Sequence, residues 1–210
     1  MDYGENPINI IDLVLEQSDA QDIAVSILKK LEDEKKKRTE FYNLIHEDIS
    51  AEFIHGEIVF HSPARYSHLE VSANVFSILR SYVKNKQLGT VLIEKAMISL
   101  GRNDFEPDIV YFSNQKSNSF TEDQKLFPAP DIAVEILSSS TEKNDRGVKF
   151  KEYALHDIAE YWIIDPEKKT FEQYILEGKS YMLNSKVTNK GIILCKVLQG
   201  LEITVGDLWA

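Results

Sequence analysis

The sequence has a single cysteine, Cys195, so no disulfide can form within the chain. It has no CxxC pair and no cluster of cysteine and histidine, which argues against a structural zinc site. No stretch approaches the roughly 18 consecutive apolar residues of a membrane span. The first residues carry Asp2 and Glu5 instead of the basic and apolar regions of a secretory leader. These absences predict a cytoplasmic protein with no membrane partner.

Positive charge is scarce, with 24 basic against 34 acidic residues and a formal net charge of −10. The imbalance is concentrated near the start of the chain. Residues 1–60 hold 14 acidic and 6 basic side chains, whereas residues 61–210 hold 20 acidic and 18 basic ones. This distribution excludes a basic field over the whole molecule, although it leaves room for a local basic surface. Non-specific binding to nucleic acid should therefore be weak.

The length of 210 residues and the hydrophobic content of 43% suit one substantial core. Apolar residues recur at helical spacing over residues 8–47, which predicts a helical extension over 1–50 in front of a single domain over 51–210. The charged run at 32–38 is typical of a solvated helix face, and a partner-binding arm is the alternative.

The spacing of apolar residues changes near residue 52 from a helical pattern to a strand-like one. The pattern after that point predicts the helices and strands of the domain. The expected elements are a hairpin around His55-Gly56, a helix over 65–86, strands within 90–100, 107–112 and 131–137, a polar loop at 114–119, a helix over 141–155, and strands at 160–165, 171–176, 181–186 and 192–197. The order helix, three strands, helix, strand from 65 to 165 predicts an α/β fold whose mixed central sheet is flanked by helices.

The segment 131–137 is almost continuously apolar, as expected for a strand buried on both faces, yet it contains Glu135. An ionised carboxylate in that environment must be paired, protonated or bound to a metal. The alternative is an edge strand with Glu135 facing water. A second acid, Asp108, follows Pro107 at the start of another apolar strand, where an ordinary turn residue is the alternative.

Two strands of one sheet can bring Asp108 and Glu135 to a common point. Like charges at that distance repel each other, and a divalent cation such as Mg²⁺ resolves the repulsion. A water bound to such a cation is a stronger nucleophile because its pKa is lowered.

Basic residues occupy the helix that follows Glu135, and a lysine there could orient a water or stabilise charge on phosphate oxygens. Lys149 and Lys151 are two positions apart, so they point to different sides of the helix and at most one can face the site. The spacing does not choose between them, and a solvated helix face is the alternative for both.

An ordered series of motifs resembles the PD-(D/E)xK nuclease superfamily and, more narrowly, the Uma-type family of predicted restriction endonucleases. The motifs extend over about residues 52–180. They are His55-Gly56-Glu57, Ser62-Pro63-Ala64, Ser67-His68, Asn74, Glu106-Pro107-Asp108-Ile109-Val110, Ala129-Pro130-Asp131, Val134-Glu135-Ile136-Leu137-Ser138, Thr141, Lys149 with Tyr153, and Glu160-Tyr161-Trp162-Ile163-Ile164-Asp165-Pro166.

The resemblance implies a restriction-endonuclease-like fold and assigns roles to residues. The superfamily lysine two positions after the second acid is replaced here by Leu137, and Lys149 occupies the matching place in the following helix. The resemblance also makes Glu57 a supporting site residue and gives His68 a matching position, although a histidine on a helix is more often structural.

The hypothesis is a Mg²⁺-dependent endonuclease acting on DNA, with Mn²⁺ as a substitute. Asp108, Glu135 and the carbonyl of Ile136 would hold the metal, and Lys149 would orient the attacking water. Two alternatives remain: a non-catalytic interaction module on a degenerate nuclease fold, and a hydrolase of another phosphate ester. A homodimer would suit cleavage of both strands, and the N-terminal helices could bind a protein partner.

Overall fold

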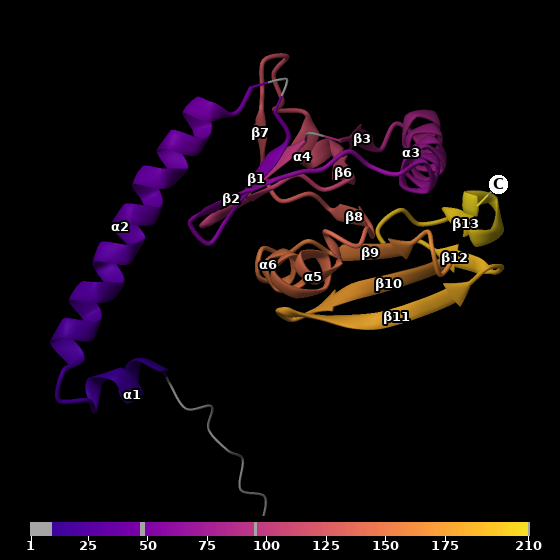
Figure 1. Cartoon of the computed structure of the whole chain (residues 1–210). Helices are drawn as coiled ribbons and strands as arrows, with labels where there is room; N and C mark the ends of the chain where they lie inside the picture. The colour runs from indigo at the N-terminus through magenta and orange to yellow at the C-terminus, as the bar shows by residue number, and fades with distance from the viewer. Residues whose placement is uncertain (1–9, 47–48, 95, 210) are drawn as a thin grey trace, which may run out of the picture.

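The structure is a computed structural model that describes residues 10–46, 49–94 and 96–209 (Figure 1). Ile8 and the other expected helical residues before Ile10 lie outside these ranges. Within the described ranges, none of the helices combines the length and the apolar character that crossing a membrane requires.

The helices surround strands that form three sheets. The helical segments are α1 (Ile10–Leu15), α2 (Ala20–Leu44), α3 (Tyr66–Lys86), α4 (Asn114–Ser117), α5 (Glu142–Asn144), the π-helical turn η1 (Asp145–Lys149), α6 (Phe150–Leu155) and the 3-10 helix η2 (Val205–Trp209). The strands are β1 (Ala51–Ile54), β2 (Glu57–Phe60), β3 (Gly89–Ile93), β4 (Met97–Leu100), β5 (Asn103–Phe105), β6 (Ile109–Ser113), β7 (Leu126–Phe127), β8 (Ile132–Ile136), β9 (Glu160–Asp165), β10 (Thr170–Glu177), β11 (Ser180–Thr188), β12 (Ile192–Leu194) and β13 (Glu202–Thr204).

The largest sheet has six strands in the order β11-β10-β9-β8-β6-β3. It is mixed, because β8 pairs in parallel with β9 and antiparallel with β6. A five-stranded sheet, β2-β1-β5-β4-β7, and the pair β12-β13 complete the fold. This arrangement confirms the predicted mixed sheet with helices on its faces.

Side-chain alternation along β8 divides the core into two layers. Ile132, Val134 and Ile136 pack with α3, whereas Ala133 packs on the opposite face with residues of α6 and the five-stranded sheet. Since successive residues of a strand point to opposite faces, Glu135 lies on the same face as Ala133. The carboxylate is thereby directed between the two large sheets.

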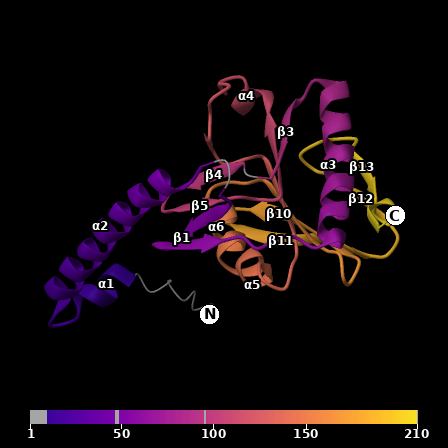
Figure 2. The same ribbon diagram turned by 45° about the horizontal axis from the view of Figure 1, so that its top comes forward.

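The helix α2 extends away from the sheets and meets them only toward its C-terminal end (Figures 1 and 2). Arg38 binds the buried carboxylate of Asp104 through both oxygens, at 2.6 Å each. Tyr42 donates a further hydrogen bond to Asp104 at 3.0 Å. Phe41 packs with Phe53 in a small apolar cluster. These contacts fix the C-terminal half of α2 to the domain.

Several expected elements differ in detail from the observed ones. The single helix expected over 8–47 is two helices separated at residues 16–19, and the strand expected within 90–100 is β3 and β4, which belong to different sheets. The loop expected at 114–119 begins with the short helix α4. The helix expected over 141–155 contains the π-helical turn η1.

The buried carboxylate of Glu160 links the C-terminal segment to the six-stranded sheet through hydrogen bonds. Its Oε1 accepts hydrogen bonds from Trp162 Nε1 at 2.7 Å and Gln173 Nε2 at 2.5 Å. Its Oε2 accepts from the backbone amides of Lys196 and Val197, both at 2.9 Å. One side chain thus connects β9 and β10 with the segment that leads to β13.

We expect Glu160→Ala to lower the free energy of unfolding by about 3 kcal/mol, because several buried donors would lose a charged acceptor. Urea unfolding would measure the change. Glu202→Ala, at an exposed position of β13, serves as the control and should change stability by less than about 0.5 kcal/mol. Equal losses in the two variants would contradict the assigned role of Glu160.

Candidate active site

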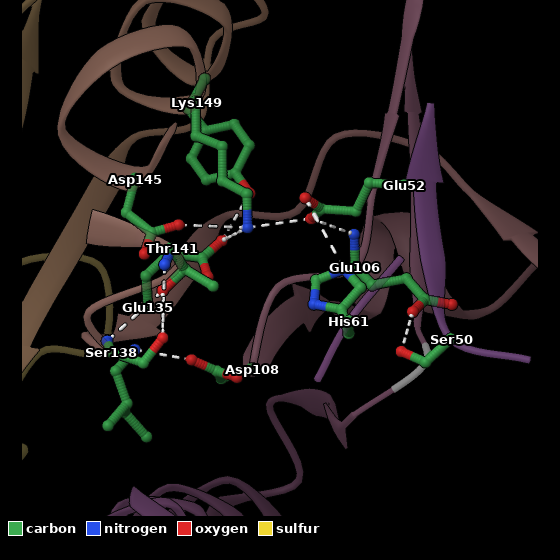
Figure 3. Close-up of polar contacts among 12 residues, drawn as sticks. Ser50, Glu52, His61, Glu106, Asp108, Glu135, Ser138, Thr141, Asp145 and Lys149 are labelled. Carbon is green, nitrogen blue, oxygen red and sulfur yellow. Dashed lines mark hydrogen bonds and ion pairs between the residues drawn. The ribbon is translucent and has the colours of Figure 1, made fainter. Parts of the chain in front are cut away.

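Asp108 and Glu135 meet at one end of the six-stranded sheet, as the sequence predicted. The antiparallel register pairs Ile109 with Val134, so Asp108 lies beside the end of β8. The backbone amide of Ile136 donates a hydrogen bond to Asp108 Oδ2 at 2.6 Å. The two carboxylates therefore come from adjacent strands and border one cleft (Figure 3).

Glu135 lies in a central strand and is only 3% exposed, so the alternative of an edge strand facing water is wrong. Tyr153 donates a hydrogen bond to Glu135 Oε1 at 2.7 Å, and Lys149 Nζ donates to the same oxygen at 3.1 Å. Burial raises the pKa of Glu135 well above its ordinary value, and neighbouring carboxylates add to this effect, whereas Lys149 opposes it.

Lys149 is the charged centre of the site. Its Nζ lies 2.9 Å from Glu52 Oε1, 3.1 Å from Glu135 Oε1 and 3.2 Å from Asp145 Oδ1 (Figure 3). Burial alone would lower the pKa of Lys149, but the three carboxylates outweigh burial and raise it well above the ordinary value. The side chain is therefore a buried ammonium. Lys151 is exposed, so the choice that the spacing left open falls on Lys149.

The π-helical turn explains how one short segment supplies two inward side chains. Asp145 and Lys149 are the first and last residues of η1, and both are buried. A π-helical turn widens the helix and often occurs at functional sites. Here it directs the carboxylate of Asp145 and the ammonium of Lys149 from the same turn into the cleft.

Asp145 is a site residue that the sequence reasoning missed. Among the described residues, neither of its carboxylate oxygens has a hydrogen-bond partner, and Lys149 is its ion-pair partner at 3.2 Å. Burial raises the pKa of Asp145, while Lys149 lowers it. The available signal was the four-residue spacing between Asp145 and Lys149, which puts an acid and a lysine on one helix face.

Glu52 is the second residue that the sequence reasoning missed. It lies in β1, is 2% exposed, and accepts a hydrogen bond from the backbone amide of Glu106 at 2.9 Å in addition to the Lys149 contact. His61 Nε2 lies 3.7 Å from the other oxygen of Glu52. The sequence signal that could have identified Glu52 is the same as for Glu135: a single acidic residue within a buried strand.

Glu57, which the family resemblance favoured, is not brought into the cleft. It is exposed and pairs with Ile54 beside the hairpin turn, whereas Glu52 pairs with Val59 farther along the hairpin. Both acids lie on one face of the hairpin, separated by about 7 Å along the strands. Position along the hairpin, not its face, keeps Glu57 outside.

His68 reaches the site from α3. Its Nε2 lies 3.2 Å from Asp108 Oδ1. Burial lowers the pKa of His68, but the hydrogen bond to Asp108 and the charge of that carboxylate outweigh burial and raise the pKa. The histidine therefore supports one oxygen of Asp108, and the amide of Ile136 binds the other.

These residues line a cleft of about 700 Å³. Six acidic residues line the cleft, among them Glu52, Asp108, Glu135 and Asp145, against one lysine, one arginine and two histidines, which leaves an excess of negative charge. Within the described ranges, no three His, Cys, Asp or Glu side chains are grouped closely enough to hold a metal by themselves. Mg²⁺ needs only one or two carboxylates because it retains several waters, so Asp108 and Glu135 fit this cation.

Comparisons with known proteins agree with the fold. No curated protein matches the chain. A solved structure, titled as a putative nuclease belonging to DUF820 from Anabaena variabilis ATCC 29413, is similar at 20% sequence identity and a TM-score of 0.69. The match covers 81% of this chain and 96% of that chain. This likeness shows a restriction-endonuclease-like fold. The model of the Uma2 family, described as "Putative restriction endonuclease", matches residues 38–206, and the chain therefore belongs to the Uma2 family.

Proposed function

We propose that this chain is an endonuclease that hydrolyses phosphodiester bonds in DNA with the help of Mg²⁺. The observation that carries the proposal is the convergence of Asp108 and Glu135 on one cleft, with Lys149 Nζ 3.1 Å from Glu135. Two carboxylates beside a buried ammonium match the requirements of phosphoryl transfer, which depends on positioning and on stabilising charge. The family description supports DNA as the substrate class.

Asp108 and Glu135 are the residues that would hold Mg²⁺ or Mn²⁺. The amide of Ile136 donates to Asp108, and the N–H and C=O of one strand residue point to the same neighbouring strand. The Ile136 carbonyl is therefore directed to the same side and offers a third oxygen. When bound, the cation lowers the pKa of water and polarises a phosphoryl oxygen.

Lys149 supplies a fixed positive charge for the reaction. Its ammonium is buried against three carboxylates, so a hydrogen bond to an attacking water or to a phosphate oxygen with developing negative charge would replace one of these contacts. Glu52 and Asp145 act as positioning residues, because they hold this ammonium 2.9 Å and 3.2 Å from their own oxygens. Tyr153 orients Glu135 in the same way through its 2.7 Å hydrogen bond.

The acidic residues around the site affect how a phosphate substrate can bind. Phosphates are repelled by uncompensated carboxylates, so productive binding should require the cation, and non-specific binding should be weak. Leu137 in place of the superfamily lysine is what a non-catalytic module would show, but Lys149 supplies an ammonium at the same acid from another element, as catalysis requires.

We expect Lys149→Ala to reduce the rate of Mg²⁺-dependent DNA cleavage by at least about 10²-fold, because a fixed donor to the developing charge is lost. A gel assay on plasmid and linear DNA would measure the rate. Lys151→Ala is the matched control, since Lys151 lies two residues away on the exposed side of the helix. Retained cleavage by purified, folded Lys149→Ala would refute the assigned role.

Calorimetric titration of Mn²⁺ and Mg²⁺ tests the metal site without any choice of substrate. We expect the wild type to bind one cation at the cleft and Glu135→Ala to lose that binding, because the variant lacks one of the two carboxylate ligands. Glu57→Ala is the control, since Glu57 is exposed at the hairpin turn, and it should bind as the wild type does. Undiminished binding by Glu135→Ala would place the metal elsewhere.

A further inference from the structure

The N-terminal helices expose an apolar surface that the domain does not cover. Helix α1 contributes no buried residue, and Phe41 is the only buried residue of α2. Four apolar side chains of α1 are between 45% and 75% exposed, namely Ile10, Ile11, Leu13 and Leu15. Four in the first half of α2 are between 38% and 66% exposed, namely Val25, Ile27, Leu28 and Leu31. We refer to these eight side chains as the arm surface.

The arm surface lies beyond the domain of the family. The family match begins at residue 38, near the point where Arg38 and Phe41 attach α2 to the sheets. The preceding part of α2 extends away from the body (Figure 2). In water, a helix derives most of its stability from packing an apolar face. An exposed apolar stripe on an extended helix therefore indicates an interaction surface.

The charges along α2 indicate which partner the arm surface binds. Residues 17–26, at the start of α2 and in the turn before it, carry Asp19 and Asp22 and no basic residue, whereas the segment 29–38 carries six basic and three acidic residues. Val25, Ile27 and Leu28 lie at or next to the boundary between these segments of opposite charge, and Leu31 lies within the basic one. Such a helix is complementary to itself only when a second copy runs in the opposite direction, because the acidic segment of each copy then lies beside the basic segment of the other.

We propose that the arm surface binds a second copy of this chain, with the two α2 helices antiparallel and a two-fold axis near Ile27 and Leu28. The two-fold symmetry makes each contact occur twice, as expected for a symmetric dimer. Leu31 of one helix would pack near Ala24 of the other, since both are three to four residues from the axis. A parallel pair would instead align the two acidic segments and repel.

Light scattering of the full chain tests the proposal. We expect the wild type to have twice the 24.1 kDa mass of one chain, and Leu28→Glu to be a monomer at concentrations where the wild type is a dimer. Leu155→Glu is the matched control, because Leu155 is also exposed, at 52%, but lies on α6 of the domain. It should remain a dimer. A monomeric wild type, or a dimeric Leu28→Glu, would overturn the proposal.

Cross-linking of single-cysteine variants tests the direction of the helices. The native Cys195 is buried, so it should not interfere. In the antiparallel pair, cysteines at Ile27→Cys lie close to the axis and should form a disulfide between chains under mild oxidation. Cysteines at Lys35→Cys would be about 22 Å apart, far beyond disulfide reach, given about 1.5 Å of helix per residue.

Either of two results would refute this arrangement. Cross-linking of Lys35→Cys as efficient as that of Ile27→Cys would indicate parallel or random association. Failure of both variants to cross-link would show that α2 does not form the interface. Because neither measurement involves DNA cleavage or metal binding, the outcome is independent of the proposed nuclease activity.

Discussion

The ammonium of Lys149 joins its own helical turn to both large sheets. It contacts Glu52 of the five-stranded sheet, Glu135 of the six-stranded sheet and Asp145 of its own helical turn. Removing these charged groups from water costs several kcal/mol each, so the arrangement persists because each group neutralises another. An apolar cluster packs the two large sheets together, and this shared ammonium fixes the geometry of the cleft between them.

The same arrangement leaves the site with more negative than positive charge. Asp145 has carboxylate oxygens without hydrogen-bond partners among the described residues, and burial raises the pKa of both Asp145 and Glu135. Unsatisfied buried acids reduce stability, and proteins retain them where function requires them. A divalent cation between Asp108 and Glu135 would compensate the excess charge, which links the electrostatic cost of the fold to the chemistry proposed for the cleft.

The chain combines this domain with an arm of different character. The domain buries its apolar residues in two layers around the six-stranded sheet, whereas α1 and the first half of α2 leave theirs exposed. The family match excludes the arm up to residue 37, so catalysis and association would reside in separate segments of the protein.

The sequence by itself determined the strands of the central sheet and named Asp108 and Glu135 as acids on two of them, because apolar runs and alternation are local properties that survive folding. It also indicated that Glu135 needed a partner. The tertiary structure brought the two acids to one cleft and directed Lys149 into it, because Lys149 is buried at the end of η1 whereas Lys151 is exposed on α6. It likewise placed Glu52 in the site and left Glu57 outside. These two acids share a face of one hairpin, and only long-range packing fixes which of them lies against the six-stranded sheet.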